Sequence, residues 1–316
     1  MIKSRVLSLT FIVFVVLVLT IALEKNQLIS FDDTLSYVAG LFFAEEIPSS
    51  QIRSEYASST LKLLIVPGHE KDTGGTEYKD LRERDIVLAL SKYLSLEFQK
   101  DTHIKTFVTR DGSGDFVPWL SDYVTRNKEA IKIFRTTAAV TAKYGVISGQ
   151  FERNVVVEHN NASSISSLFL HGINKYANDN NINLVLHLHF NDYPGRKYNK
   201  PGIYKGFAIY MPESQLPNAN ASRELALAIA SRLKEVEPPS NYPKERPGLI
   251  EDQDLIAMGP NGTRDGVSLL VEYSYIYEKQ LTDPNLRDKT LRDLAHATYL
   301  GVEDYFNNSD TLSVAR

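Results

Sequence analysis

The sequence predicts a single α/β domain with a twisted, mostly parallel or mixed sheet flanked by helices. Short apolar runs alternate along the chain with longer segments of helical period, a pattern typical of strands joined by crossover helices. The chain has 316 residues, 43% of them hydrophobic, which is enough to bury the core of one such domain. A further apolar segment at the N-terminus is too long and too continuous to belong to this pattern.

The expected strands are short apolar runs bounded by Gly, Pro or polar residues. The first ends in Pro67-Gly68, which predicts a buried strand that leads directly into a loop. In chain order the expected strands are 61–66, 103–109, 181–190, 206–211 and 267–273.

Helices are expected between these strands. Apolar residues fall on one face of the first, at Ile86, Val87, Leu90, Leu94 and Phe98. A second helix is expected at 221–237, ended by two prolines, and an amphipathic helix at 285–306 closes the domain. The range 127–180 is longer than one crossover helix requires, so we expect an insertion there, of the kind that often forms a lid or a specificity element.

The N-terminus predicts a transmembrane anchor or a signal helix. Lys3 and Arg5 precede a stretch without charges, Val6–Leu23, which at about 1.5 Å per residue reaches roughly 27 Å, enough to span a membrane. No small-x-small cleavage site follows closely, so an anchor is favoured over a cleaved signal. In both cases the basic residues stay in the cytoplasm and the rest of the chain is exported, as a single-pass membrane protein or, after cleavage, a secreted one.

These features divide the chain into segments. Residues 1–5 are the cytoplasmic end, 6–23 the anchor or signal and 24–58 a linker. The domain is expected at 59–307, and 308–316 form a tail.

Composition limits the chemistry. The net charge of −4 gives no basic surface for nucleic acid. The chain has no cysteine, which excludes disulfides, thiolate nucleophiles and thiolate-bound zinc. Any metal must therefore be held by histidine, aspartate or glutamate.

Four ionisable residues stand where expected strands end or a helix begins. His69 follows the first strand, Glu83 starts the first helix, His189 lies near the end of the third strand, and Glu272 ends the last. Ligands in open α/β sheets gather beyond the carboxyl ends of the strands. Two imidazoles and one carboxylate would leave an open position on zinc for water, and a second carboxylate could serve as general base. This predicts zinc ligands at His69, Glu83 and His189, with Glu272 as acid/base.

The stretch LVLHLHFND contains a second histidine, His187, two residues before His189. Alternate side chains of a strand lie on the same face, so geometry alone does not decide which of the two is the ligand.

Five short segments, in order, resemble the zinc-dependent N-acetylmuramoyl-L-alanine amidases known as amidase type 3. They are PGHEK at 67–71, ERDI at 83–86, TRD at 109–111, HLHFN at 187–191 and LVEY at 270–273. The resemblance covers roughly residues 61–306. It implies a hydrolase that cuts the amide between the lactyl group of N-acetylmuramic acid and the L-alanine of the stem peptide in peptidoglycan.

Position by position, the resemblance places the zinc ligands at His69, Glu83 and His189 and the catalytic glutamate at Glu272. His187 then stands where the family usually has serine, next to the ligands rather than among them. Asn191 and Arg110 are expected to support the site. The chain departs from the family in its loop glycines, which Glu70-Lys71 replace, and in YSYIYE after the last strand.

Two alternatives remain open at this point. One is a catalytically silent domain that binds peptidoglycan or regulates other hydrolases, and the other is a zinc hydrolase of the same fold that cuts a different amide. All four residues required for activity are present, which favours the enzyme. In some family members a helix inserted in this region occludes the zinc until a partner removes it, so an activating protein is a further hypothesis.

Overall fold

We describe a computed structural model of the chain, for residues 47–71, 75–147, 152, 157, 159, 162–259, 262–263 and 266–307. The expected anchor at 6–23, most of the linker range and the tail at 308–316 lie outside these residues. No helix in the described part is long and apolar enough to cross a membrane.

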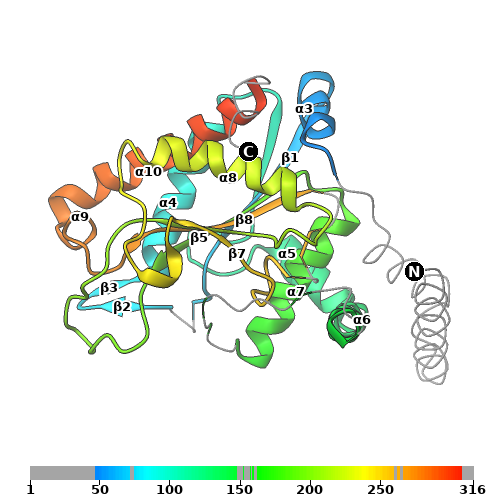
Figure 1. Cartoon of the computed structure of the whole chain (residues 1–316), viewed down its shortest axis with the longest axis horizontal. Coiled ribbons are helices and arrows are strands. Elements are labelled where there is room, and N and C mark those ends of the chain that lie inside the picture. The colour runs from blue at the N-terminus through cyan, green and yellow to red at the C-terminus, as the bar shows by residue number, and fades with distance from the viewer. Residues whose placement is uncertain are drawn as a thin grey trace.

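A six-stranded mixed sheet forms the centre of the domain, in the order β4-β1-β5-β8-β6-β7 (Figure 1). Four neighbouring strands are parallel, whereas β6 runs antiparallel to β8 and β7 parallel to β6. The strands are β1 (Leu61–Pro67), β4 (Ile104–Val108), β5 (Leu184–Asn191), β6 (Ala208–Met211), β7 (Leu249–Glu251) and β8 (Val267–Tyr275). The predicted mixed α/β architecture is therefore confirmed, and β7 is a strand that the sequence pattern did not predict.

Helices cover both faces of the sheet, which explains why its central strands are apolar on both sides. On one face lie α4 (Glu83–Phe98), α8 (Ala219–Leu233) and α10 (Pro284–Asn307). Their apolar residues pack on alternate strand residues, among them Leu63, Leu186 and Val271. A short helix, α9 (Lys279–Thr282), connects β8 to α10.

The other face carries α5 (Pro118–Arg126), α6 (Lys128–Ile147) and α7 (Ser164–Asp179). Here Leu120, Val124 and Ile173 pack against strand residues that include Leu64 and Val185. Both α6 and α7 lie in the range 127–180, and α7 is the crossover helix that leads into β5. Most residues between the two helices lie outside the described part.

A small hairpin stands apart from the sheet, beside the N-terminal end of α4 (Figure 1). It consists of β2 (Glu77–Tyr78) and β3 (Leu81–Arg82), each only two residues long. It connects the loop after β1 to α4 and so fixes where that helix begins.

Helix α3 (Ser49–Ser58) packs on the domain just before β1, inside the range predicted to be a linker. Arg53 forms an ion pair with Glu224 of α8 at 2.8 Å. The ring of Tyr56 stacks on Phe306 of α10, with 4.2 Å between centroids. Residues 49–58 therefore belong to the folded unit; their pattern is weak because few of them are buried.

We predict that Tyr56→Ala lowers the free energy of unfolding by about 1–3 kcal/mol, because it removes the stack on Phe306 and a hydrogen bond to Asp101. Chemical denaturation measures the change. Gln51→Ala, an exposed change in the same helix, is the control and should cost under about 0.5 kcal/mol. Equal stability of the Tyr56 variant and the wild type would show that α3 contributes nothing to the fold.

Candidate metal centre

The four predicted residues lie at one edge of the sheet, where the parallel strands end. His69 lies in the loop after β1, Glu83 begins α4, and His189 lies near the end of β5. Glu272 of β8 stands directly beside His189 in the strand register. The side chains come from four separate elements, and only the parallel topology brings them to the same edge.

His69, Glu83 and His189 form one compact group. Each offers a nitrogen or oxygen atom, and these atoms lie within 4.8 Å of one another. Nε2 of His69 is 2.9 Å from Oε2 of Glu83, and Nδ1 of His189 is 3.0 Å from Oε1. In the described part of the chain, no other three or more His, Asp or Glu residues form such a group.

Glu83 is the most buried member of the group, with 3% of its surface exposed. Besides the two histidines, the backbone amide of Phe190 donates to Oε1 at 3.1 Å and that of Thr76 to Oε2 at 3.0 Å. Burial opposes ionisation, but His69 and His189 hold the pKa of the carboxyl well below its usual range. Glu83 is therefore a carboxylate, and its place in the first turn of α4 suits that charge.

The loop that carries His69 requires close backbone contacts. His69 itself has φ of 63°, in the left-handed region that non-glycine residues rarely adopt. A side chain at Gly68 would overlap the His189 ring, and one at Gly75 would overlap His69 and Glu83. The buried guanidinium of Arg110 donates to the carbonyl of Gly68 at 2.8 Å and to that of Gly114 at 3.0 Å. Arg110 thus supports the loop and does not touch the three candidate ligands.

His187 lies on the same face of β5 as His189, one step further from the strand end. It is buried, and burial together with the nearby His189 lowers its pKa to about 3, so it is neutral. Among the described residues, its Nε2 has no hydrogen-bond partner. His187 is therefore a neutral residue next to the His-Glu-His group, and its Nε2 forms no hydrogen bond that would hold one of the three candidate ligands in place.

Glu272 has an unusual environment for a carboxyl group. Its Oε2 is buried and has no hydrogen-bond partner within the described part of the chain. Burial raises its pKa well above the usual value, and the charges of Glu83 and Glu245 add to the effect. An unpartnered buried carboxyl costs stability, so its retention points to a chemical task.

A second buried acidic residue near Glu272, Glu245, was not predicted from the sequence. It accepts hydrogen bonds from Asn191 at 2.8 Å, Tyr210 at 2.9 Å, Ser240 at 2.6 Å and Tyr275 at 2.9 Å. Asn191, which was predicted to support the site, attaches the end of β5 to Glu245.

A chain of contacts that was not predicted from the sequence also holds Glu83 in place. Arg196 binds both oxygens of Asp192 at 2.7 Å, and Asp192 accepts the hydroxyl hydrogen of Thr76 at 2.6 Å. Thr76 in turn donates its amide to Glu83. The aspartate beside the HLHFN segment was the available signal, but Thr76 lies 116 residues before it, so the two could not be paired without the fold.

The donor set fits zinc. Two imidazoles and one carboxylate are the protein ligands of a known class of catalytic zinc sites, which leave a position open for water or substrate. The neutral imidazole that burial favours at His189 and the ionised Glu83 are the protonation states that a metal requires. The unpartnered oxygen of Glu272 at the same edge is consistent with a group that acts on a water or substrate there.

We predict that Asp192→Asn weakens binding of Zn²⁺ by about 10–100-fold, because it loosens the contact chain from Arg196 through Thr76 to Glu83. Competition with a chromophoric chelator measures the affinity. Lys197→Ala, an exposed change in the same loop, should leave it unchanged. Unaltered affinity in the Asp192 variant would mean that the chain of contacts does not position Glu83.

Comparison with known proteins agrees with the site. In structure, the chain resembles the N-acetylmuramyl-L-alanine amidase Ami1 from Mycobacterium smegmatis, with a TM-score of 0.51 at 12% identity over 78% of this chain and 97% of that one. The CwlD amidase from Clostridioides difficile, solved with the GerS lipoprotein, gives a TM-score of 0.49 at 18% identity, over 78% of this chain and 98% of that one.

At these identities the solved structures show a shared fold only, and no curated protein matches the sequence. Residues 63–304, however, match the family described as N-acetylmuramoyl-L-alanine amidase. This range contains both histidines and both glutamates of the site. It also contains all six strands of the sheet, except for the first two residues of β1. The chain belongs to the N-acetylmuramoyl-L-alanine amidase family of peptidoglycan hydrolases.

Proposed function

We propose that this enzyme uses zinc held by His69, Glu83 and His189 to cut the amide between N-acetylmuramic acid and the L-alanine of the stem peptide. The observation that carries the assignment is the His-Glu-His group with an unpartnered carboxyl, Glu272, beside it. When bound, zinc would polarise the scissile carbonyl and lower the pKa of a water to about 7.

Glu272 is proposed as the acid/base. Its Oε2 has no hydrogen-bond partner among the described residues, and the positive charge of bound zinc would favour the ionised carboxylate that takes a proton from the attacking water. The environment that raises its pKa helps the carboxyl hold that proton until the leaving amine accepts it. Glu83 and Glu245 both contribute negative charge to that environment, and neither is proposed to transfer a proton.

The exported, membrane-anchored location belongs to this proposal. It is supported by the apolar segment Val6–Leu23 with the basic residues before it and by a substrate that lies outside the cytoplasmic membrane.

Digestion of purified peptidoglycan tests the function. The wild type should release free stem peptides that begin with L-alanine, identified by mass spectrometry. Glu272→Ala should lower kcat by at least about 100-fold while zinc content stays near one per chain. Cleavage of another bond would contradict the substrate assignment, and full activity of the Glu272 variant would contradict the mechanism.

The two histidines of β5 should behave differently. His189→Ala should lose zinc and activity together, because it removes a ligand. His187→Ser should keep zinc and most activity, since Nε2 of His187 holds no described group in place. Metal analysis and peptide release on the two purified variants check this. Loss of zinc from the His187 variant alone would reverse the assignment of the ligand.

A further inference from the structure

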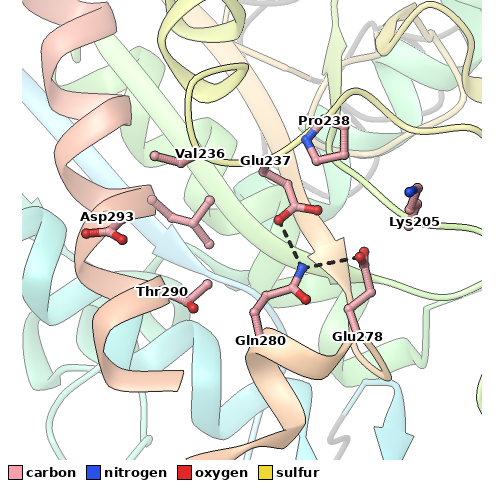
Figure 2. Close-up of a pocket in the computed structure, with 9 residues that line it drawn as sticks. Lys205, Val236, Glu237, Pro238, Glu278, Gln280, Thr290 and Asp293 are labelled. Atoms are coloured by element: carbon pink, nitrogen blue, oxygen red, sulfur yellow. Dashed lines mark hydrogen bonds between the residues drawn. The ribbon is translucent and has the colours of Figure 1, made fainter. Parts of the chain in front are cut away.

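A pocket of about 350 Å³ lies beside the proposed catalytic edge, between the ends of α8 and α10 and the loops before β6 and after β8 (Figure 2). One of its lining residues, Glu278, follows β8, which carries Glu272, and another, Lys205, precedes the neighbouring strand β6. The amide of Gly206 donates to Oε1 of Glu278 at 2.9 Å, and Ala208, two residues on, is the register partner of Glu272. The pocket is therefore near the same edge of the sheet as the metal group, on the face that α8 and α10 cover, whereas His189 and Glu272 point to the other face.

Its charge is mainly negative. Three carboxyl groups line it, from Glu237, Glu278 and Asp293, against one cation, Lys205. Lys205 forms no ion pair with any residue in the described ranges, so it does not neutralise these groups by direct contact. In Figure 2 the carboxyl groups of Glu237 and Glu278 both approach the amide nitrogen of Gln280, and Lys205 lies to one side of them.

Glu237 is the unusual member. Only 4% of its surface is exposed, and it keeps one bond, from Gln280 to Oε2 at 3.0 Å. Its Oε1 has no hydrogen-bond partner within the part of the chain that the structure describes. A buried carboxyl oxygen left without a partner costs stability, which indicates that a donor from outside completes the bonding.

The lining also indicates what kind of donor this is. The carboxyl groups do not form a group of three within metal-ligand range, so a metal ion is disfavoured among the described residues. Val236, Pro238 and Leu294 supply apolar walls next to the acids. Acidic groups beside such walls suit an organic cation with a hydrocarbon chain.

We propose that this pocket binds an aliphatic primary ammonium group, and that the natural source is the side-chain amine of a stem peptide. The assignment of the stem peptide as the natural source of the amine rests on the proposed function. It would make Glu237 a specificity-determining residue that favours stem peptides with a free amine over those in which the amine is blocked.

The protonation of Glu237 predicts how the affinity of the pocket for an amine depends on pH. Burial, with a smaller effect of Glu278, raises its pKa to about 8, whereas Gln280 and Lys205 act in the opposite direction. Asp293, on α10, is the other charged group that lines the pocket. Near neutral pH the carboxyl holds a proton, which an incoming ammonium should displace. Affinity for an amine should therefore rise with pH by about tenfold per unit until pH 8, because the amine itself stays charged to about pH 10.

Calorimetry on the full chain with n-pentylamine tests the site itself. We expect n-pentylamine to bind at pH 8.5 and to bind at least tenfold more weakly at pH 6.5. The binding enthalpy should depend on the ionisation enthalpy of the buffer, because a proton is released. The uncharged 1-pentanol should not bind. Glu237→Gln should weaken binding at least tenfold, and Lys205→Met should tighten it by removing a competing cation. Glu235→Gln, an exposed change two residues away, is the matched control.

Equal affinity of the wild type and Glu237→Gln for n-pentylamine would overturn the proposal, as would the absence of any binding at millimolar concentration. If Glu237→Gln does not fold, Asp293→Asn and Lys205→Met must shift the affinity in opposite directions, and a failure to do so overturns it equally.

Kinetics on two soluble peptidoglycan fragments, one with free side-chain amines and one with acetylated amines, test the source. We expect a KM at least fivefold higher for the acetylated fragment, an unchanged kcat, and no such difference in Glu237→Gln. Equal KM values with intact n-pentylamine binding would overturn the stem-peptide assignment alone. No cleavage of either fragment by the wild type would instead overturn the proposed function, while the calorimetry still decides the ammonium site.

Discussion

The site depends on the burial of one carboxylate, Glu83. A charge with 3% of its residue surface exposed is stable only if hydrogen bonds and opposite charges replace the lost water. Two imidazoles and two backbone amides do so here, and they come from three separate parts of the chain. Satisfying Glu83 therefore fixes, at the same time, the loop after β1, the end of β5 and the turn before the β2-β3 hairpin.

The surroundings of Glu272 contrast with those of Glu83. Glu83 is fully bonded and holds a low pKa, whereas one oxygen of Glu272 is without a described partner and its pKa is raised. Glu245, which accepts hydrogen bonds from four neutral donors, is the third carboxyl group whose charge bears on this edge. Pairs of acids with pKa values driven apart by their surroundings are a common way for a protein to separate a structural or ligand role from proton transfer.

The parts of the fold that could be predicted were those with a local signal. β1, β5 and β8 are apolar runs of seven to nine residues, and α4 and α10 have clear helical periods. β7 has only three residues and the hairpin strands two each, too short for any periodicity to register. Helix α3 was missed for a different reason, because only two of its ten residues are buried and its docking also depends on the polar contacts of Arg53 and the ring of Tyr56.

In the site, the residues with a motif position could be named in advance, and those defined only by contact could not. His69, Glu83, His189 and Glu272 stand at strand ends or a helix start. Glu245 and Thr76 act through partners distant in the sequence, whereas Arg196 acts through Asp192, four residues away. Nothing in the neighbourhood of these three residues distinguishes them from surface residues. The same holds for Glu237, whose unusual feature is an oxygen that has no partner.

Helix α3 also determines at which edge of the sheet the chain enters the domain. It ends two residues before β1 begins, so the chain enters at the amino-terminal edge of the sheet, and β1 then runs about 20 Å to the loop that bears His69. Because α3 is docked by an ion pair and a ring stack, it cannot swing freely around that entry point. The chain therefore enters the domain at the edge of the sheet opposite the one that holds the metal group (Figure 1).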